Sequence, residues 1–326
     1  MNRHTIVVGC LVWVLGLGTA CAQRGGTFTD EAAAGLDYQI QGEYAGTIDA
    51  DGTRWGGQII ALGDGKFHAV GFPGGLPGDG WDPSNQKQEV DGQLDGKQAV
   101  FKSDTFRLEV DGTVIRVIDA NGSKLGELKK VRRESPTLGA KPPAGAVVLF
   151  DGSGVGAWDK GTLVDGKYLG ATNCSTKEKF NDHTIHLEFR TPFMPNARGQ
   201  GRGNSGVYVN HRYEVQVLDS FGLKGADNEC GGIYQQKAPK LNMCFPPLAW
   251  QTYDIDFKSA KYDAAGKKTT NARITVRHNG QTIYEDLELP KETPGGIGEG
   301  PEAAGLFLQD HGNPVVFRNV WIVPAK

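Results

Sequence analysis

The sequence predicts an all-β protein in two parts, a small antiparallel β domain followed by a larger two-sheet jelly roll. Glycine accounts for 47 of the 326 residues, whereas an average share of about 7% would give roughly 23. Ten Asp-Gly or Asn-Gly dipeptides supply the positive φ angles that tight hairpin turns need. They begin at Asp51, Asp64, Asp79, Asp91, Asp95, Asp111, Asn121, Asp151, Asp165 and Asn279. The length is that of about two domains.

Residues 23–131 are predicted to form the small antiparallel β domain. Seven of the ten turn dipeptides lie in this part of the chain, and short alternating strands between close turns are typical of a meander or small barrel. The clearest strands are 58–62, 66–70, 106–110 and 114–118. The stretch 71–83 is so rich in Gly and Pro that we expect a surface loop. Residues 132–146 shift to basic residues, Pro and Ala, which indicates an interdomain linker.

Residues 147–326 are predicted to form the larger domain. Eight or more strands with long connections suit a two-sheet jelly roll better than a single barrel. The expected strands are 147–150, 185–190, 205–209, 213–218, 252–257, 273–278, 305–309 and 315–323.

Composition and charge exclude some classes of function. Hydrophobic residues make up 38% of the chain, which argues against wholesale disorder. The 35 basic and 38 acidic residues give a net charge of −3 without a basic stripe, so we expect no nucleic-acid partner. The Gly-rich stretch 199–206 precedes a strand and lacks the Gly-Lys-Ser/Thr of a phosphate loop, so no nucleotide cofactor is expected.

Residues 1–22 are typical of an export signal. Arg3 and His4 precede an apolar stretch at 5–17, and Ala20-Cys21-Ala22 fits a cleavage site. This stretch is short for a membrane span, and we expect no transmembrane span in the mature chain. Cleavage after Ala22 and lipid anchoring at Cys21 stay open as alternatives. Both predict a periplasmic or secreted protein.

Export makes disulfide bonds permissible. The exported chain keeps Cys174, Cys230 and Cys244, for which one disulfide and one free thiol is the simplest arrangement. We favour a Cys230–Cys244 disulfide because these two cysteines are the closest in sequence. A zinc site is the alternative, although no CxxC or HxxxH spacing supports it.

The predicted strand at 213–218 carries polar residues on one face. Alternate side chains share a face of a strand, so Glu214 and Gln216 point away from the core that Val215 and Val217 enter. Asp219 has the wrong parity unless a bulge re-aims it. Three polar groups could then line a groove, although an ordinary solvated strand face would have the same pattern.

Two loops carry further polar candidates. Residues 199–206, which include Asn204, have the glycine density that permits close backbone approach to a ligand. The run Gln309-Asp310-His311 ends another predicted strand, and His311 is a candidate acid, base or metal ligand. Lys177 and Tyr234 are weaker candidates for contact with a hydroxyl-rich ligand.

Several strings in the second domain resemble one family in both order and spacing. They are LFDG (149–152) with Trp158, Lys177 with Phe180, GNSGVY (203–208), YEVQVLDS (213–220), GIY (232–234), WQTYD (250–254), HNG (278–280), LQDHGNPV (308–315) and FRNVW (317–321). The stretch 147–326 is thus similar to the 3-keto-disaccharide hydrolase family, also described as 3-keto-glucoside-1,2-lyase/3-keto-2-hydroxy-glucal hydratase. The first domain lies outside this resemblance.

The resemblance implies a concanavalin-A-like jelly roll and an enzyme that acts on a glycoside or oligosaccharide; together with the signal at 1–22, the expectation is an exported carbohydrate-active enzyme. The implied chemistry removes the C2 proton of a 3-keto sugar, eliminates the C1 oxygen and then adds water. Glu214 and His311 would be the acid/base pair or, with Asp219, ligands of a divalent metal ion. The implied substrate-binding residues are Asn204, Gln216, Lys177, Tyr234 and Gln309.

Two other functions stay open at this point. The Glu-x-Gln-x-x-Asp spacing looks like the Glu-x-Asp-x-x-Glu strand of jelly-roll glucanases, but Gln216 replaces the middle carboxylate. That replacement argues against a retaining glycosidase, which needs two suitably placed carboxyl groups. A non-catalytic carbohydrate-binding jelly roll is the other alternative, since the same fold hosts lectins and enzymes.

Overall fold

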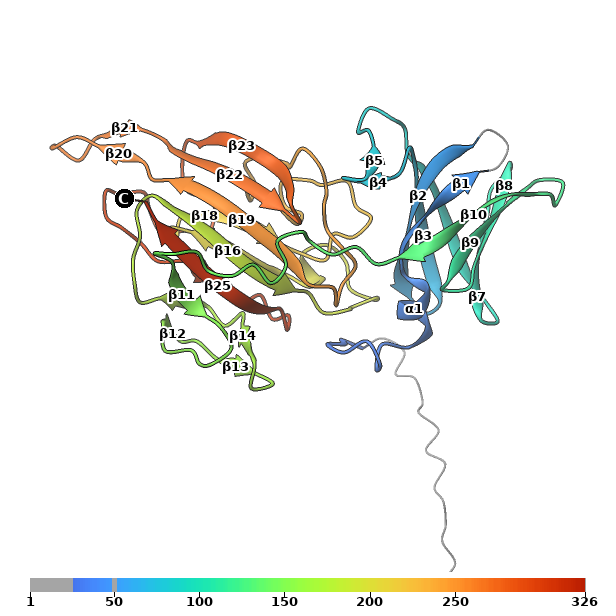
Figure 1. Ribbon diagram of the computed structural model, residues 1–326, viewed down its shortest axis with the longest axis horizontal. Helices are drawn as coiled ribbons and strands as arrows, with labels where there is room; N and C mark the ends of the chain where they lie inside the picture. The colour runs from blue at the N-terminus through green and yellow to red at the C-terminus, as the bar shows by residue number, and fades with distance from the viewer. Residues whose placement is uncertain (1–25, 49–51, 326) are drawn as a thin grey trace, which may run out of the picture.

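A computed structural model describes residues 26–48 and 52–325. Figure 1 shows two β domains connected by the linker 132–146, with the N-terminal domain in blue and green and the C-terminal domain in green to red. This confirms the predicted all-β class and the order of its two parts. The predicted export signal at 1–22 lies outside the described residues. Within the described residues, no helix has the length and apolar character to cross a membrane.

The N-terminal domain is a closed eight-stranded antiparallel barrel in the order β1-β10-β9-β8-β7-β6-β3-β2. Its strands are β1 (Gly42–Ile48), β2 (Thr53–Gly63), β3 (Lys66–Pro73), β6 (Gln88–Asp95), β7 (Gln98–Lys102), β8 (Phe106–Val110), β9 (Val114–Asp119) and β10 (Lys124–Val131). Closure arises because β1 pairs with β2 on one side and with β10 on the other. The four strands predicted for this domain are all present.

Alternation along the strands fills one half of the barrel with large apolar side chains. Tyr44, Phe67 and Phe101 are fully buried there. The helix α1 (Gly35–Ile40) lies across this end of the barrel, where the hydroxyl of Tyr44 donates a 2.5 Å hydrogen bond to the carbonyl of Ile40. The helix therefore closes this end.

The turn dipeptides behave as predicted with one exception. Nine of the ten glycines have a positive φ angle, as tight turns require. The exception is Gly92, which lies inside β6. A Cβ at Gly92 would collide with the ring of Phe101, so this glycine makes room for an aromatic side chain of the core. The predicted loop at 71–83 is partly wrong, because β3 runs to Pro73 and two short parallel strands follow, β4 (Leu76–Pro77) and β5 (Gly80–Trp81).

The C-terminal domain is a two-sheet sandwich, as predicted. The larger sheet has the order β13-β14-β25-β16-β19-β22-β23, with β11 paired to β25. Its strands are β11 (Val147–Phe150), β13 (Leu163–Val164), β14 (Tyr168–Gly170), β16 (His183–Arg190), β19 (Gln251–Lys258), β22 (Ala272–His278), β23 (Gln281–Leu289) and β25 (Val316–Pro324).

The smaller sheet has the order β12-β15-β24-β17-β18. Its strands are β12 (Trp158–Asp159), β15 (Cys174–Thr176), β24 (Phe307–Leu308), β17 (Ser205–Val209) and β18 (Tyr213–Val217). A short two-stranded pair, β20 (Lys261–Tyr262) and β21 (Lys268–Thr270), extends from the larger sheet, and the 3-10 helix η1 (Gly199–Gly201) precedes β17. Val207, Val215 and Leu308 enter the fully buried core between the sheets, so their neighbours on these strands face outward.

The linker at 132–146 lies on the larger sheet through hydrogen bonds. The hydroxyl of Ser135 is 2.6 Å from that of Thr252, and the hydroxyl of Thr137 donates to Asp254 at 2.6 Å. The amide of Gly139 donates to Glu188 Oε1 at 2.6 Å. Polar side chains on the outer face of the sheet therefore hold this segment in place.

The predicted Cys230–Cys244 disulfide is not formed in the structure. Cys174, Cys230 and Cys244 are all free and buried. The Cys230 and Cys244 side chains are neighbours that interact with each other, but each sulfur also has other partners. Cys230 Sγ lies 3.3 Å from the hydroxyl of Tyr253, and Cys244 Sγ lies 3.5 Å from the carbonyl of Leu218. These contacts satisfy both thiols without a covalent bond.

Candidate functional site

The outer face of the smaller sheet places Glu214 beside Tyr208. The two residues are paired across β17 and β18, and the hydroxyl of Tyr208 donates a 2.8 Å hydrogen bond to Glu214 Oε2. The other carboxylate oxygen, Oε1, lies over Gly206, where a Cβ would collide with it. Glycine at 206 therefore lets the carboxylate lie flat across the neighbouring strand.

Burial changes the acid strength of Glu214. Its side chain is 2% exposed, and desolvation raises its pKa from 4.5 to about 7, although the hydrogen bond from Tyr208 acts in the opposite direction. Burial and the adjacent carboxylate also raise the pKa of Tyr208 above its ordinary value, so its hydroxyl stays a donor. A carboxyl group with a pKa near neutrality is suited to both taking up and releasing a proton.

Further polar and aromatic groups surround this pair. Gln309 Nε2 donates to the hydroxyl of Tyr208 at 3.2 Å. Half-buried Tyr234 donates its backbone amide to the carbonyl of Glu214 at 3.2 Å, and its side chain interacts electrostatically with Tyr208. Phe307 packs edge-on against Tyr208, and His211 stacks on Phe307 with centroids 4.4 Å apart. Two predicted substrate-binding residues, Tyr234 and Gln309, are therefore next to Glu214.

The loop before β17 covers the next outward position on β18. Gln200, on η1, accepts hydrogen bonds at its Oε1 from Gln216 Nε2 at 2.9 Å and from Asn204 Nδ2 at 3.1 Å. Gln216 and Asn204 are both 1% exposed. The structure thus places Gln216 and Asn204 at the site, but both are buried and hold the loop in position through Gln200. Gln200 is the more exposed residue of the three.

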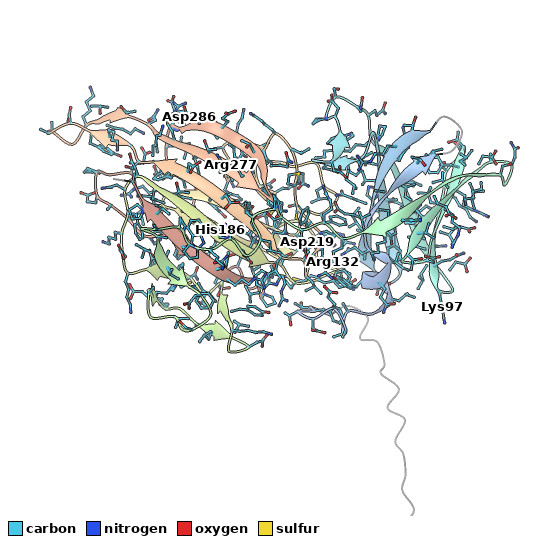
Figure 2. The ribbon with its side chains drawn as sticks, viewed as in Figure 1. Lys97, Arg132, His186, Asp219, Arg277 and Asp286 are labelled. Atoms are coloured by element: carbon cyan, nitrogen blue, oxygen red, sulfur yellow. The ribbon has the colours of Figure 1, made fainter. Side chains whose placement is uncertain are left out.

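Asp219 pairs with an arginine and does not join Glu214 and His311 as the predicted metal ligands would. Its carboxylate forms a 2.7 Å ion pair with Arg202 Nε, and both side chains are buried. Arg202 also donates through Nη1 to the carbonyl of Ala61 on β2 of the barrel at 3.2 Å. Figure 2 shows Asp219 at the junction of the two domains. β18 ends at Val217 and its pairing with β17 has no register shift. The Asp219 carboxylate neutralises Arg202 and does not join Glu214.

The predicted metal ligands are not assembled. Within 26–48 and 52–325, no group of three or more His, Cys, Asp or Glu residues could hold a metal ion. Asp219 pairs with Arg202, and His311 is exposed on the loop after β24. The donor set proposed from sequence, Glu214 with Asp219 and His311, therefore does not fit a three-ligand site.

The remaining candidates lie at the edges of the outer face. His311 lies between Gln309 and Asn313, and Asn313 Oδ1 accepts a 2.8 Å hydrogen bond from the amide of Asn204. No described contact joins His311 to Glu214. Lys177 is exposed at the end of β15, with β24 and β17 between it and β18, and its Nζ donates to the carbonyl of Gly156 at 2.8 Å. Lys177 is therefore not part of the cluster around Glu214.

Tyr208, Gln200 and His211 were missed as members of this cluster. The pairing of Tyr208 with Glu214 could be predicted from the three-residue connection 210–212 between the two expected strands. Asn210 tolerates a left-handed backbone well, and both Asn210 and His211 adopt one in this turn. The role of Gln200 depends on loop packing that strand parity does not predict.

Gly206→Ala should impair the site while leaving the fold intact. The new Cβ would displace Glu214 Oε1 and press on the Tyr208 ring at 2.9 Å, whereas the backbone of this position is ordinary for alanine. The carboxylate end of Glu214 can move aside, but the buried Tyr208 ring must shift as well. We expect kcat/KM on the substrate proposed below to fall by about 10- to 100-fold, with some loss of Tm but a protein that still folds.

Gly201→Ala is the matched control for this substitution. Gly201 ends η1, just before β17, and a Cβ there would meet nothing within 4 Å. It should keep wild-type activity. Equal activity of Gly206→Ala and Gly201→Ala would show that the position of the Glu214 carboxylate does not matter.

Comparison with known proteins supports the resemblance seen in the sequence motifs. The family model described as the 3-keto-alpha-glucoside-1,2-lyase-like domain matches residues 145–323. The 2.13 Å crystal structure of a candidate glycosyl hydrolase from Parabacteroides distasonis ATCC 8503 is 31% identical, with a TM-score of 0.52, over 56% of this chain and 85% of that chain. A second structure from that organism is 18% identical, with a TM-score of 0.41, over 56% of this chain and 94% of that chain. No curated protein matches.

The family match covers more than half of the chain and includes both sheets of the sandwich. It also spans every residue of the cluster around Glu214. The chain therefore belongs to the family of 3-keto-alpha-glucoside-1,2-lyase-like domains, a family of carbohydrate-active enzymes.

Proposed function

We propose that this protein cleaves 3-keto-glycosides, 3-keto-disaccharides among them, by elimination followed by hydration, with Glu214 as the base. The observation that carries the proposal is the buried Glu214 carboxyl group, whose pKa is raised to about 7. A 3-keto group acidifies the proton on C2, so a base with a pKa near neutrality is strong enough to remove it. An ordinary exposed carboxylate, with a pKa near 4.3, would be a weaker base.

The proposed reaction has two balanced steps. In the first, Glu214 takes the C2 proton, electrons form the C1–C2 double bond through an enolate, and the C1–oxygen bond breaks. The departing oxygen takes up a proton and leaves as an alcohol or sugar. In the second, water adds across the double bond, with hydroxyl at C1 and a proton at C2. The products are the free 3-keto sugar and the released alcohol.

The neighbouring residues have roles that follow from their contacts. Tyr208 orients Glu214 through its hydrogen bond, and Gln309, tied to Tyr208, would bind a sugar hydroxyl or the enolate oxygen. Tyr234 lies beside this pair and would form one side of the sugar site. His311, on the exposed loop after β24, is our candidate for the group that protonates the departing oxygen.

A retaining glycosidase mechanism is less well supported by the same residues. It requires a second carboxyl group about 5–5.5 Å from the first. Gln216, two residues after Glu214, is an amide, and the Asp219 carboxylate is paired with Arg202. Neither can serve as the second carboxyl group.

The test compares a 3-keto-disaccharide with its unoxidised parent. We expect turnover of the keto sugar alone, and uptake of one solvent deuteron at C2 of the product when the reaction runs in D2O. Turnover of the unoxidised parent would indicate a conventional glycosidase. Binding of either sugar without turnover would indicate a carbohydrate-binding domain, and both results would overturn the proposal.

We also propose that the enzyme acts outside the cytoplasm, because residues 1–22 have the pattern of an export signal. Its glycoside substrate would then be met in the periplasm or in the medium. Mass spectrometry of the mature N-terminus would identify cleavage after Ala22 or a lipid on Cys21. An intact Met1 in the mature protein would contradict export by this signal.

A further inference from the structure

The barrel contains a cavity that the proposed reaction does not use. Its volume is about 260 Å³. It is lined near its mouth by Ile48 at the end of β1, Trp55 near the start of β2 and Phe106 at the start of β8. These positions are at the end of the barrel opposite α1, which closes the other end through Ile40. Over the residues that the structure describes, the barrel is therefore a cup with one closed and one open end.

The cavity has a buried wall and a partly exposed apolar rim. The wall residues are at most 7% exposed and comprise Ile59, Ala69, Ile115, Val117 and Leu128. The rim residues are half-buried large apolar side chains and comprise Ile48, Trp55, Val90, Phe106, Leu108 and Leu125. An eight-stranded barrel is just wide enough either to be filled by its own side chains or to hold one small ligand, and the partly exposed inward-facing side chains here correspond to the second case.

Glycine contributes to the open volume. Gly57 faces inward on β2, where a Cβ would lie 3.0 Å from Ile115 and 3.5 Å from Leu128. Gly71, on β3, has the Trp55 ring beside it, 3.5 Å from where its Cβ would be. Both glycines stand where a larger residue would have occupied part of the cavity or displaced its wall.

The lining determines the chemistry of a ligand. None of the described lining residues is charged, and Gln88 and Thr105, its only polar side chains, are exposed. A charged or hydroxyl-rich ligand would lose its hydration inside without gaining hydrogen bonds. An apolar ligand would gain about 25 cal/mol for each Å² removed from water. An apolar cavity of about 150 Å³ holds benzene, so this one has room for a larger molecule.

We propose that the barrel is a binding site for an uncharged aromatic molecule of one or two rings. Trp55 and Phe106 at the rim offer ring faces and edges to such a ligand, and the closed end limits its length. This site is separate from Glu214 and does not depend on the reaction proposed for the sandwich.

Calorimetric titration of the whole chain with 2-naphthol tests the proposal. Val117→Phe places a ring in the cavity and should weaken binding by at least about tenfold. Ile118→Phe is the matched control, because Ile118 is the next residue on β9 and does not line the cavity. It should bind within about twofold of wild type. Naphthalene-2-sulfonate, which has the same rings and a charge, should bind at least about tenfold more weakly.

A second filling variant, Ala69→Leu, keeps the test decisive if Val117→Phe does not fold, and a circular dichroism melt checks each variant. Failure of the wild-type chain to bind 2-naphthol would overturn the proposal. Equal binding by the filled variants and wild type would also overturn it, as would equal binding of the sulfonate. If 2-naphthol binds only when the protein dimerises, the open end of the barrel is an interface with a second copy of the chain, and the proposal is wrong.

Discussion

Glu214→Gln should abolish turnover of a 3-keto-disaccharide while the protein stays folded. Glutamine has the same shape and can still accept the hydrogen bond from Tyr208, but it cannot take up a proton. We expect kcat to fall by about 10²- to 10⁴-fold, the usual contribution of a general acid or base. In wild type, kcat/KM should rise with pH through about 7 and level off above it, because the base must be ionised. A steady-state pH profile of both proteins measures these effects.

The same substitution should stabilise the protein at high pH. The pKa of Glu214 is raised from 4.5 to about 7 on folding, so the buried group favours its neutral form. Below pH 4.5 it is protonated in both states and has no effect. Between pH 4.5 and 7 its ionisation increasingly opposes folding, and above pH 7 the opposition is complete. Glu214→Gln should therefore raise the free energy of unfolding at pH 8 by about 3 kcal/mol, and by much less at pH 4.5.

Denaturant titrations at the two pH values provide the check. Glu299→Gln is a useful control, since Glu299 is another largely buried carboxylate but is paired with Lys268. It should lose stability at pH 8, where the glutamate pairs with a charge. Wild-type turnover by Glu214→Gln would show that this carboxyl group is not the base. A loss of stability at pH 8 would show that it is not a buried acid without a charged partner.

Breaking the Arg202–Asp219 ion pair should have the largest effect on stability. Its two side chains are 7% and 0% exposed. Removing either partner leaves the other charge buried, so Arg202→Met and Asp219→Asn should each cost about 3–5 kcal/mol of the free energy of unfolding. The double variant should cost clearly less than the sum, because it leaves no unpaired charge. Chemical denaturation of the three variants gives the cycle.

Arg277→Met is the matched control for this cycle. Arg277 pairs with Asp256 at 3.0 Å, but the side chains are 41% and 48% exposed, and exposed pairs contribute about 0–1 kcal/mol. If the Arg202 and Asp219 variants cost no more than Arg277→Met, or if their effects simply add, the buried pair does not stabilise the domain junction.

Strand parity predicted much of the fold and part of the site. Glu214 and Gln216 were assigned to the outer face because Val215 and Val217 alternate with them, and the structure confirms this arrangement. The strands around the core were predictable for the same reason, since burial repeats every second residue. The two-part β architecture followed from turn dipeptides, whose backbone angles are a local property.

The remaining features depend on contacts between distant parts of the chain. Asp219 was assigned to the site by spacing, but its partner Arg202 lies 17 residues away on a loop that also contacts the barrel. Gly92 looked like a turn residue because the sequence does not show that the Phe101 ring lies over it. Closure of the barrel depends on β1 meeting β10, which no local pattern encodes.

The order of strands around the barrel has a consequence for how the chain folds. Each barrel strand pairs with the next barrel strand along the chain, and β1 with β10 is the one pairing between distant strands. In the sandwich, by contrast, β11 and β16 both pair with β25, which lies near the C-terminus and is far from them in the sequence. Short-range pairings form faster than long-range ones, and N-terminal domains are completed first during synthesis. The barrel should therefore finish folding first. The carbonyl of Ala61 is then already in place when the loop that carries Arg202 forms in the later domain and donates its hydrogen bond to it.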